Sequence, residues 1–268
     1  MDQTAKSNMT SLVDVHQEMF VDDIPFWLDL TVDHQEILDL GCGSGRVGIP
    51  LAEAGRSVWG VDLDLDRLKR VKNKLTGHSA AVQKRIHVWV MDMTLLRVRK
   101  LFRAVISPCN TFSLFQLDEK KAIIHRVADH LRDRGFFAVS VPNPYLINAI
   151  RDQGLPPEDD QESAPEGTFT HPNTGYPVQV SSQLAIHPAG LKWTWIYDHL
   201  YPDGRVQRDR CSQIHVYSPV DEYRALFNEG GFSVHLYGDF KGKSFSKSSP
   251  YLIIVGRKRD QQTTSFSR

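Results

Sequence analysis

A glycine-rich turn between an apolar strand and a helix is the feature that most constrains this chain. Residues 36–40 (EILDL) are predicted to form a strand, and the turn at 41–45 (GCGSG) follows it directly. The apolar stretch at 46–54 has helical character and stops before Gly55. A turn of this kind lets the backbone approach a ligand closely and directs free amide groups toward it. The sequence therefore predicts a strand, loop and helix unit with a ligand site at its turn.

The same alternation of strand and helix continues through the first half of the chain. Helices are predicted at 65–75 and 119–131, and further strands at 57–61, 87–90, 102–107 and 135–141. Strands that alternate with helices form a parallel sheet with right-handed crossovers. The predicted fold class is therefore α/β, a Rossmann-like doubly wound sheet.

The second half of the chain departs from this alternation. Residues 151–175, rich in proline, glycine and acids, predict an exposed loop. Three β-like runs follow at 177–186, 191–201 and 204–217, separated by residues 188–190 (PAG) and by Asp203-Gly204, a strong hairpin signal. We expect them to form an inserted antiparallel sheet that caps the site.

The C-terminal part completes the predicted sheet. Ser218 is the expected N-cap of a helix with Pro219 at its first position, and this helix reaches Asn228 before a Gly-Gly pair. Strands at 233–237 and 251–256 then form an antiparallel hairpin, which brings the main sheet to seven strands.

The N-terminus predicts a helical lid. Residues 11–30 are expected to form two short helices separated at Pro25, the second capped by Asp22 or Asp23. The predicted organisation of the chain is then a lid at 1–30, a core at 31–145 and 218–258, an insertion at 146–217 and a disordered tail at 259–268.

Composition and cysteine usage exclude several classes of protein. The 32 basic residues balance the 32 acidic residues, so no overall positive field favours nucleic acid or anionic lipid. Three widely spaced cysteines without a CxxC pair support neither a disulfide framework nor a zinc site, and the histidines form no metal-binding cluster. The first residues (MDQTAKSNMT) show no basic segment followed by an apolar stretch, so we expect no export signal, and there is no run of about 18 apolar residues. We expect a cytoplasmic protein without a membrane partner or a metal.

Two kinds of ligand are compatible with a glycine-rich turn of this type. Residues 43–48 read GxGxxG and Asp62 follows about 20 residues later, as a nicotinamide dinucleotide site would require. However, the glycines begin at Gly41, and Asp39 lies two residues before them. A carboxylate at that point attracts an ammonium group and repels a pyrophosphate.

Residues 37–45 (ILDLGCGSG) resemble the first motif of class I S-adenosylmethionine-dependent methyltransferases. Four further segments resemble that family in the expected order: Val61-Asp62, the 91–93 stretch (MDM), the strand at 102–110, and the 131–137 turn into the fifth strand. The resemblance implies that Asp62 binds the ribose and that Asp92 and its neighbouring backbone bind the adenine. The implied residues for S-adenosyl-L-methionine, and for its product S-adenosyl-L-homocysteine, are Asp39, Gly41, Cys42, Gly43, Gly45, Asp62, Leu63, Asp92, Met93 and Ser107.

Within the family, the insertion after the fifth strand resembles the layout of sugar N-methyltransferases and of the glycine N-methyltransferase type. One departure concerns the acceptor, because Leu114 stands where the sugar enzymes have a histidine after strand four. A second departure, Arg103 in place of an acid, lies at the outer end of its strand, where we expect no effect on the cofactor.

The resemblance implies methyl transfer to an N or O atom of a small molecule by in-line displacement, which needs alignment more than a dedicated base. Tyr145, just past strand five, is the candidate for orienting or deprotonating the acceptor. The candidate acceptor-binding residues are Phe26, Trp27, Asn110 and Trp195. Two alternatives stay open: a non-methylating protein that binds S-adenosylmethionine, and a methyltransferase that acts on RNA or protein. The aromatic face of the inserted strand with Trp193, Trp195 and Tyr197 covers the active-site mouth, a partner subunit in a homodimer, or both.

Overall fold

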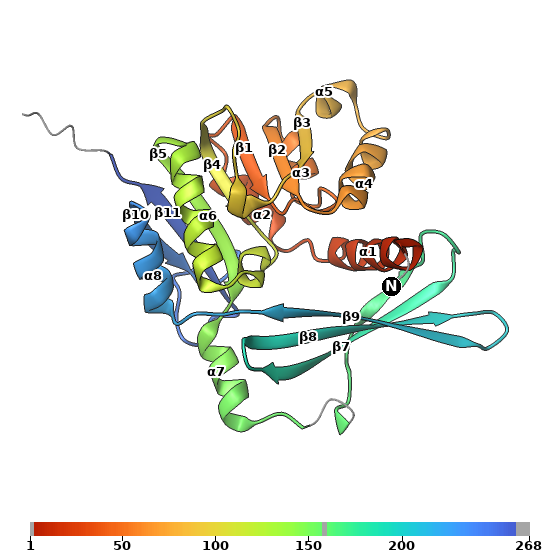
Figure 1. Ribbon diagram of the computed structural model, residues 1–268. Helices are drawn as coiled ribbons and strands as arrows, with labels where there is room; N and C mark the ends of the chain where they lie inside the picture. Colours follow the sequence, from red (N-terminus) through yellow and green to blue (C-terminus); the bar gives the residue numbers. More distant parts are fainter. Residues whose placement is uncertain (1–2, 157–159, 261–268) are drawn as a thin grey trace, which may run out of the picture.

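A seven-stranded sheet forms the centre of the molecule, and the computed structural model describes residues 3–156 and 160–260 of the chain (Figure 1). Its strands are β1 (Glu36–Leu40), β2 (Ser57–Asp62), β3 (Ile86–Val90), β4 (Phe102–Ser107), β5 (Leu131–Pro142), β10 (Phe232–Tyr237) and β11 (Tyr251–Lys258). They lie in the order β10-β11-β5-β4-β1-β2-β3, and β11 runs antiparallel to both of its neighbours, β10 and β5. This arrangement confirms the predicted α/β doubly wound fold with an antiparallel C-terminal hairpin.

Helices cover both faces of this sheet because successive strand residues point to opposite sides. Ile37 belongs to one apolar layer and Leu38, the next residue, belongs to the other. The helices that follow strands β1 to β4 are α3 (Gly48–Glu53), α4 (Leu65–Leu75), α5 (Ala80–Gln83), η1 (Met93–Leu95), η2 (Thr111–Leu114) and α6 (Leu117–His130), and helix α8 (Val220–Glu229) precedes β10. The first layer packs against α3 and α4, and the second against α6 and α8.

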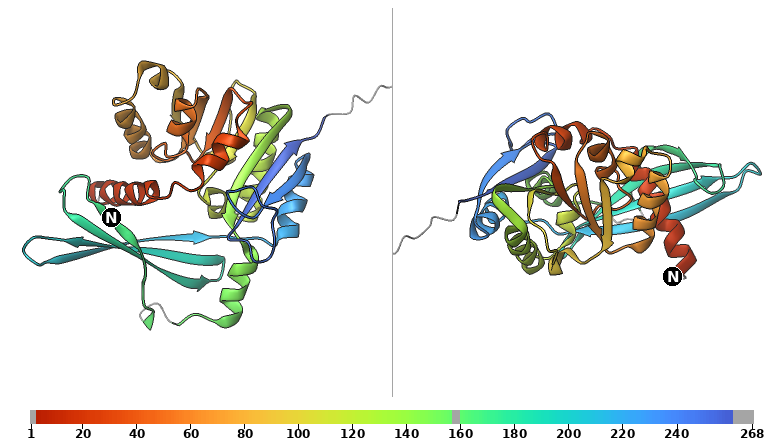
Figure 2. Two further views of the ribbon diagram at one scale, coloured as in Figure 1. Left: turned by 180° about the vertical axis from the view of Figure 1, so that it is seen from behind. Right: turned by 90° about the horizontal axis from the view of Figure 1, so that it is seen from above.

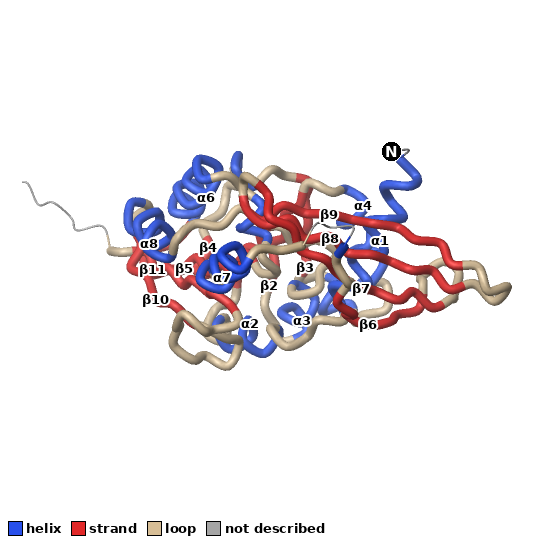
Figure 3. The backbone as a smooth tube through the Cα atoms, turned by 90° about the horizontal axis from the view of Figure 1, so that it is seen from below, coloured by secondary structure: helices blue, strands red, loops and turns tan. Residues whose placement is uncertain are grey.

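A second, four-stranded sheet lies between β5 and α8 in the sequence. Its strands are β6 (Ala164–Thr170), β7 (Pro177–His187), β8 (Gly190–Leu200) and β9 (Val206–His215), all antiparallel and in chain order. Figure 3 shows these four strands side by side from below. The turns fall at residues 188–189 and 201–205, where the sequence predicted them.

Strand β6 corrects the prediction of an exposed loop over 151–175. It pairs with β7 along its length, with an irregularity between Pro165 and Gly167. The strand carries no apolar alternation because it lies at the edge of the sheet and most of its residues are exposed. An edge strand tolerates proline and glycine, since only one of its sides forms hydrogen bonds with a neighbour. The same predicted loop begins with the last residues of helix α7 (Pro144–Gln153), which the sequence analysis did not anticipate.

The N-terminal helices also differ from the prediction. The first, α1 (Gln3–Glu18), is one long helix, and the second, α2 (Ile24–Leu30), contains Pro25 in its first turn instead of ending there. A proline in the first turn costs no hydrogen bond, because the amide groups at that position have no partner within the helix. In Figures 1 and 2, α1 lies between the main sheet and the second sheet. Leu12 and Val13 of α1 pack against Val178, Val180 and Tyr197 of the second sheet.

Two further boundaries differ from the sequence reading. Helix α8 begins at Val220 with Pro219, in extended conformation, at its N-cap, so Ser218, the predicted N-cap, lies one position before the observed cap. At the C-terminus, β11 extends to Lys258 and Asp260 forms an ion pair with Arg134, 3.3 Å away. The rest of the predicted tail, 261–268, lies outside the described residues.

Candidate active site

The glycine-rich turn brings backbone close to the end of β4. Gly41 has a φ of +73°, and a Cβ atom at this position would lie 2.4 Å from Cγ2 of Thr111. A side chain is therefore excluded both by conformation and by space. The Gly41 amide donates to the Val61 carbonyl oxygen at 2.8 Å, which fixes the turn against the end of β2. The turn thus forms a narrow cradle at the carboxyl ends of β1, β2 and β4.

Asp39 places a carboxyl group beneath this cradle. Its side chain is 1% exposed, and its Oδ1 atom has no hydrogen-bond partner within the described part of the chain. Burial raises the pKa of this carboxyl to about 7, although the nearby Arg46 guanidinium opposes the effect. A buried, unpartnered carboxyl group of this kind is costly for the protein alone and provides a site for a positively charged ligand group.

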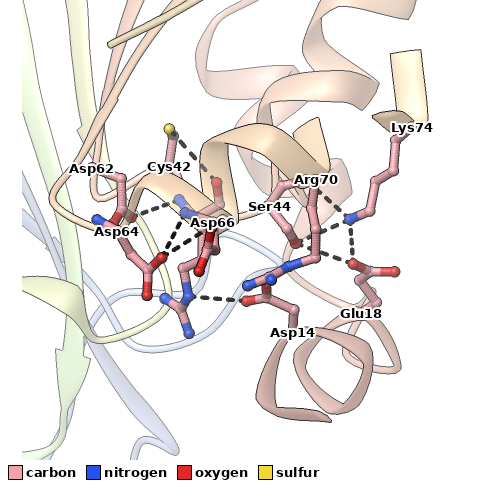
Figure 4. A network of polar contacts seen from close by, with 11 residues as sticks. Asp14, Glu18, Cys42, Ser44, Asp62, Asp64, Asp66, Arg70 and Lys74 are labelled. Carbon is pink, nitrogen blue, oxygen red and sulfur yellow. Dashed lines mark hydrogen bonds and ion pairs between the residues drawn. The ribbon is translucent and has the colours of Figure 1, made fainter. Parts of the chain in front are cut away.

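Asp62, at the end of β2, is oriented by the backbone. Its carboxylate accepts hydrogen bonds from the amides of Gly43 and Asp64, each at 2.9 Å (Figure 4). These bonds fix the carboxylate beside the turn. Cys42 lies between the two acids, and burial raises the pKa of its thiol well above its ordinary range, so the thiol packs as an apolar group.

A first cavity of about 190 Å³ opens above these groups. Leu63, Met91 and Met93 supply its apolar wall at the ends of β2 and β3, while Pro108 and Cys109 come from the segment after β4. The remaining lining residues are Asp14, Gln17, Asp39, Gly41, Cys42, Gly43, Ser44, Arg46, Val47, Asp62, Arg67, Thr111, Leu114, Phe115 and Gln213. This cavity lies where open α/β sheets bind their ligands, outside the carboxyl ends of the strands.

Helix α1 is held across this cavity by charged side chains that the sequence analysis did not identify. Asp14 forms ion pairs with Arg67 at 3.1 Å and with Arg70 at 2.6 Å, both on α4. One turn later, Glu18 contacts Lys74 of α4 and accepts from the Ser44 hydroxyl at 3.1 Å (Figure 4). The acids at 14 and 18 lie on one face of α1, because residues four apart are neighbours on a helix. This spacing, together with the basic residues of the helix predicted at 65–75, was the sequence signal for the contact between the two helices.

A second cavity of about 210 Å³ adjoins the first. The two cavities share Gln17, Cys109 and Gln213. The other residues that line the second cavity are Val13, His16, Phe20, Asp23, Asn110, Ser140, Glu166, Trp193, Trp195, His215, Phe240 and Tyr251. This cavity is therefore enclosed by α1, by the second sheet and by the C-terminal hairpin, and it provides space for a second small molecule.

The wall shared by the two cavities is held by Arg46. The Arg46 guanidinium donates to both carboxylate oxygens of Asp23 at 2.6 Å and to the Phe20 carbonyl oxygen at 2.6 Å. It also contacts the Cys109 thiol. Cys109 and Asn110 both have positive φ values, 56° and 59°, which non-glycine residues rarely adopt. Such backbone strain is concentrated at functional sites.

His215, at the end of β9, lines the second cavity with an uncharged imidazole. Burial lowers the pKa of its imidazole to about 4. Its Nδ1 lies 2.7 Å from the Ser113 hydroxyl, which donates to the Asn110 carbonyl oxygen at 2.6 Å. Because that hydroxyl proton is used, His215 donates from Nδ1 and its Nε2 keeps a lone pair. Nε2 is buried and has no partner among the described residues.

The structure brings together most of the predicted cofactor residues. Asp39, Gly41, Cys42, Gly43, Asp62, Leu63 and Met93 all line the first cavity, and Asn110 and Trp195 line the second. Three predicted residues lie outside both linings. Gly45 packs toward Ile49, Asp92 caps η1 by accepting from the Thr94 amide at 2.8 Å, and Ser107 donates to the Leu40 carbonyl oxygen at 3.1 Å.

Three predicted acceptor or catalytic residues are placed elsewhere. Phe26 and Trp27 were expected in the lid, but both are buried in the core under the main sheet because α2 packs its apolar face there. Tyr145 was expected at the reacting group, but its ring is 38% exposed and stacks on Phe245 outside both cavities. Tyr145 lies in the first turn of α7, and its amide donates to the capping Asn143 side chain at 3.0 Å.

Within the described ranges, no group of three or more His, Cys, Asp or Glu side chains is placed to hold a metal ion. No helix among these residues is both long and apolar enough to cross a membrane.

Comparison with known proteins relates this chain to methyltransferases. A family described as methyltransferase domain matches residues 37–135, which contain the glycine-rich turn and β4. A protein of Geobacillus sp. (strain WCH70) that is named as a methyltransferase is 25% identical over 227 residues, which are 84% of this chain and 85% of that protein. The cypemycin N-terminal methyltransferase of Streptomyces sp is 34% identical over 117 residues, 42% of this chain and 44% of that protein.

Solved structures show the same fold. A S-adenosylmethionine-dependent methyltransferase from Clostridium acetobutylicum has a TM-score of 0.70 and 13% identity over 89% of this chain and 91% of that chain. The sugar N-methyltransferase KedS8 from Streptoalloteichus sp has a TM-score of 0.65 and 18% identity over 88% and 85% of the two chains. In sequence the chain is thus similar to methyltransferases, over residues 37–135 to a methyltransferase domain, and it has the fold of solved S-adenosylmethionine-dependent methyltransferases.

Proposed function

We propose that this protein transfers a methyl group from S-adenosylmethionine in the first cavity to an N or O atom of a small molecule in the second. The observation that carries the proposal is the buried, unpartnered carboxyl group of Asp39 beneath a glycine turn, at the junction with a second cavity. A positively charged amino group on the ligand would satisfy this carboxyl group, whereas a pyrophosphate would be repelled by it.

The remaining residues of the first cavity fit the other parts of S-adenosylmethionine. Asp62 already accepts two backbone amides and has lone pairs left for the ribose hydroxyls. Leu63 and Met93 offer apolar surfaces for the adenine ring. The carboxylate of Asp92 bonds Thr94, so a direct bond from Asp92 to the adenine amine stays a prediction.

The chain's own contribution to the reaction is alignment and exclusion of water. When bound, S-adenosylmethionine supplies an electrophilic methyl group on a sulfonium. Helix α1 covers both cavities and is held there by Asp14 and Glu18, which keeps bulk water from the site. The lone pair on Nε2 of the neutral His215 can accept a hydrogen bond from the methyl acceptor and so orient it.

A small-molecule acceptor is supported by the shape of the second cavity. Residues from α1, β8 and the hairpin enclose it, and about 210 Å³ accommodates a compact molecule rather than a folded macromolecule. Proteins of the same fold include enzymes named as sugar N-methyltransferases. A cytoplasmic location and a homodimer formed through the second sheet stay predictions from the sequence.

Calorimetry tests the cofactor assignment. We expect S-adenosylhomocysteine to bind the wild-type protein with measurable heat and NAD to give none, because Asp39 attracts an ammonium group and repels a diphosphate. Tight NAD binding without a response to S-adenosylhomocysteine would overturn the assignment of the first cavity.

A pair of aromatic substitutions tests the acceptor cavity. Trp195→Ala should leave S-adenosylhomocysteine affinity within about threefold, roughly 0.7 kcal/mol, and abolish methyl transfer to any acceptor found in a panel of amines and alcohols. Tyr145→Phe is the matched control, because Tyr145 lies outside both cavities, and its turnover should stay at the wild-type level. The assignment fails if Tyr145→Phe stops turnover while Trp195→Ala does not.

A further inference from the structure

The second cavity combines an acid with two stacked indoles. Trp193 and Trp195 lie on one face of β8 with ring centroids 5.8 Å apart and planes 19° from parallel. Both are only partly exposed and both line the cavity together with Glu166 of β6. Among the described residues that line this cavity there is neither a lysine nor an arginine.

Glu166 presents a charged carboxylate to this space. Its side chain is 24% exposed, and burial alone would favour the neutral acid. Hydrogen bonds from His16, Ser182 and Trp193, together with the charge attraction of His16, outweigh burial, so the pKa of Glu166 is lowered and the group is ionised at neutral pH. Nε2 of His16 lies 2.9 Å from Oε2 of this carboxylate.

His16 links the Glu166 carboxylate to Tyr197. Nδ1 of His16 lies 3.3 Å from the hydroxyl of Tyr197, and burial raises the pKa of that phenol, so it keeps its proton. His16 thus contacts the Tyr197 hydroxyl through Nδ1 and the Glu166 carboxylate through Nε2. This chain of contacts fixes the position of the carboxylate in the cavity lining.

Two other titratable side chains of the cavity, Asp23 and His215, do not pair with Glu166. Asp23 is paired with Arg46 at 2.6 Å, so the charge of that guanidinium is already balanced. His215 is neutral because burial lowers its pKa to about 4. Of the two acids in the described cavity lining, Asp23 is thus paired with an arginine, whereas the partner of Glu166 is the histidine His16.

We infer that the second cavity binds the methyl acceptor through a positively charged group, which is held between the Trp193–Trp195 pair and the Glu166 carboxylate. A cation near indole faces gains from the ring quadrupole, and the carboxylate adds direct charge attraction. The inference rests on the proposed function, since it treats the second cavity as the acceptor site. It assigns Glu166 as a residue that determines specificity, and it excludes phosphate-bearing acceptors, whose charge Glu166 repels.

The test compares choline with its uncharged isostere, in which a carbon atom replaces the quaternary nitrogen. Both are titrated into wild-type protein saturated with S-adenosylhomocysteine, with binding followed by calorimetry and by tryptophan fluorescence. We expect choline to bind at least about tenfold more tightly than the isostere and to change the indole emission. Equal binding of the two probes, or binding of neither, would overturn the inference.

Two variants locate the effect. Glu166→Gln should lower choline affinity at least about tenfold and leave S-adenosylhomocysteine affinity unchanged. Glu162→Gln is the matched control, because this exposed acid lies outside the cavity lining. Choline affinity that survives Glu166→Gln in a folded variant would also contradict the inference. If S-adenosylhomocysteine does not bind the wild-type protein, the proposed function fails first and the inference fails with it.

Discussion

Asp39→Asn should weaken S-adenosylhomocysteine binding by about 10- to 150-fold, the value of one charge-assisted hydrogen bond of roughly 1.5–3 kcal/mol. The substitution keeps the size of the side chain and removes only its ability to carry a negative charge. Calorimetry at about pH 8 checks the result, because the wild-type carboxyl, with its pKa raised to about 7, is ionised there. A variant that binds as tightly as wild type would remove Asp39 from the cofactor site.

The same substitution should stabilise the unliganded protein at alkaline pH. Asp39 has a pKa of 3.8 when unfolded and about 7 when folded, so the folded state holds more protons between these values. The free energy of unfolding of wild type therefore falls as pH rises from about 4 to about 7, by at most roughly 4 kcal/mol. Asp39→Asn removes this loss, and urea unfolding at about pH 5 and about pH 8 should show a flatter profile. A profile as steep as that of wild type would contradict the assigned pKa.

Trp27→Ala should lower the free energy of unfolding by about 3–5 kcal/mol, as expected for a large aromatic side chain in a core. Trp27 is 0% exposed and packs edge-on against Phe26 with centroids 5.3 Å apart. Its indole also donates to Asp23 at 3.0 Å, and Asp23 in turn holds Arg46. Urea denaturation provides the measurement.

Trp27→Phe is the conservative control. It keeps much of the apolar volume and removes the hydrogen bond to Asp23, which still has its two bonds to Arg46. We expect a smaller loss of unfolding free energy and unchanged acceptor preference. If Trp27→Ala lowered the free energy of unfolding by less than about 1 kcal/mol and altered the acceptor preference, Trp27 would belong to the acceptor site and not to the core.

The sequence by itself determined the elements of the main sheet and the groups at their ends. Apolar strands separated by helices of 3.6-residue period predict a parallel sheet, and the glycines at 41, 43 and 45 mark its ligand turn. Because acids at the carboxyl ends of neighbouring parallel strands meet at one edge of the sheet, the sequence is sufficient to place Asp39 and Asp62 close together. Local patterns are sufficient here, since each signal lies within a few residues.

The acceptor cavity was decided by the tertiary structure alone. Glu166 lies on an exposed edge strand that carries no apolar alternation, so nothing in its neighbourhood predicts a strand or a cavity. His16 reaches Glu166 only because α1 packs across the second sheet, 150 residues away in the sequence. The sequence predicted that Trp27 binds the methyl acceptor. In the structure Trp27 lies in the core, because α2 packs its apolar face against the main sheet. Contacts between distant segments depend on how whole elements pack, and the free energy of that packing is shared over many side chains, so no local pattern records it.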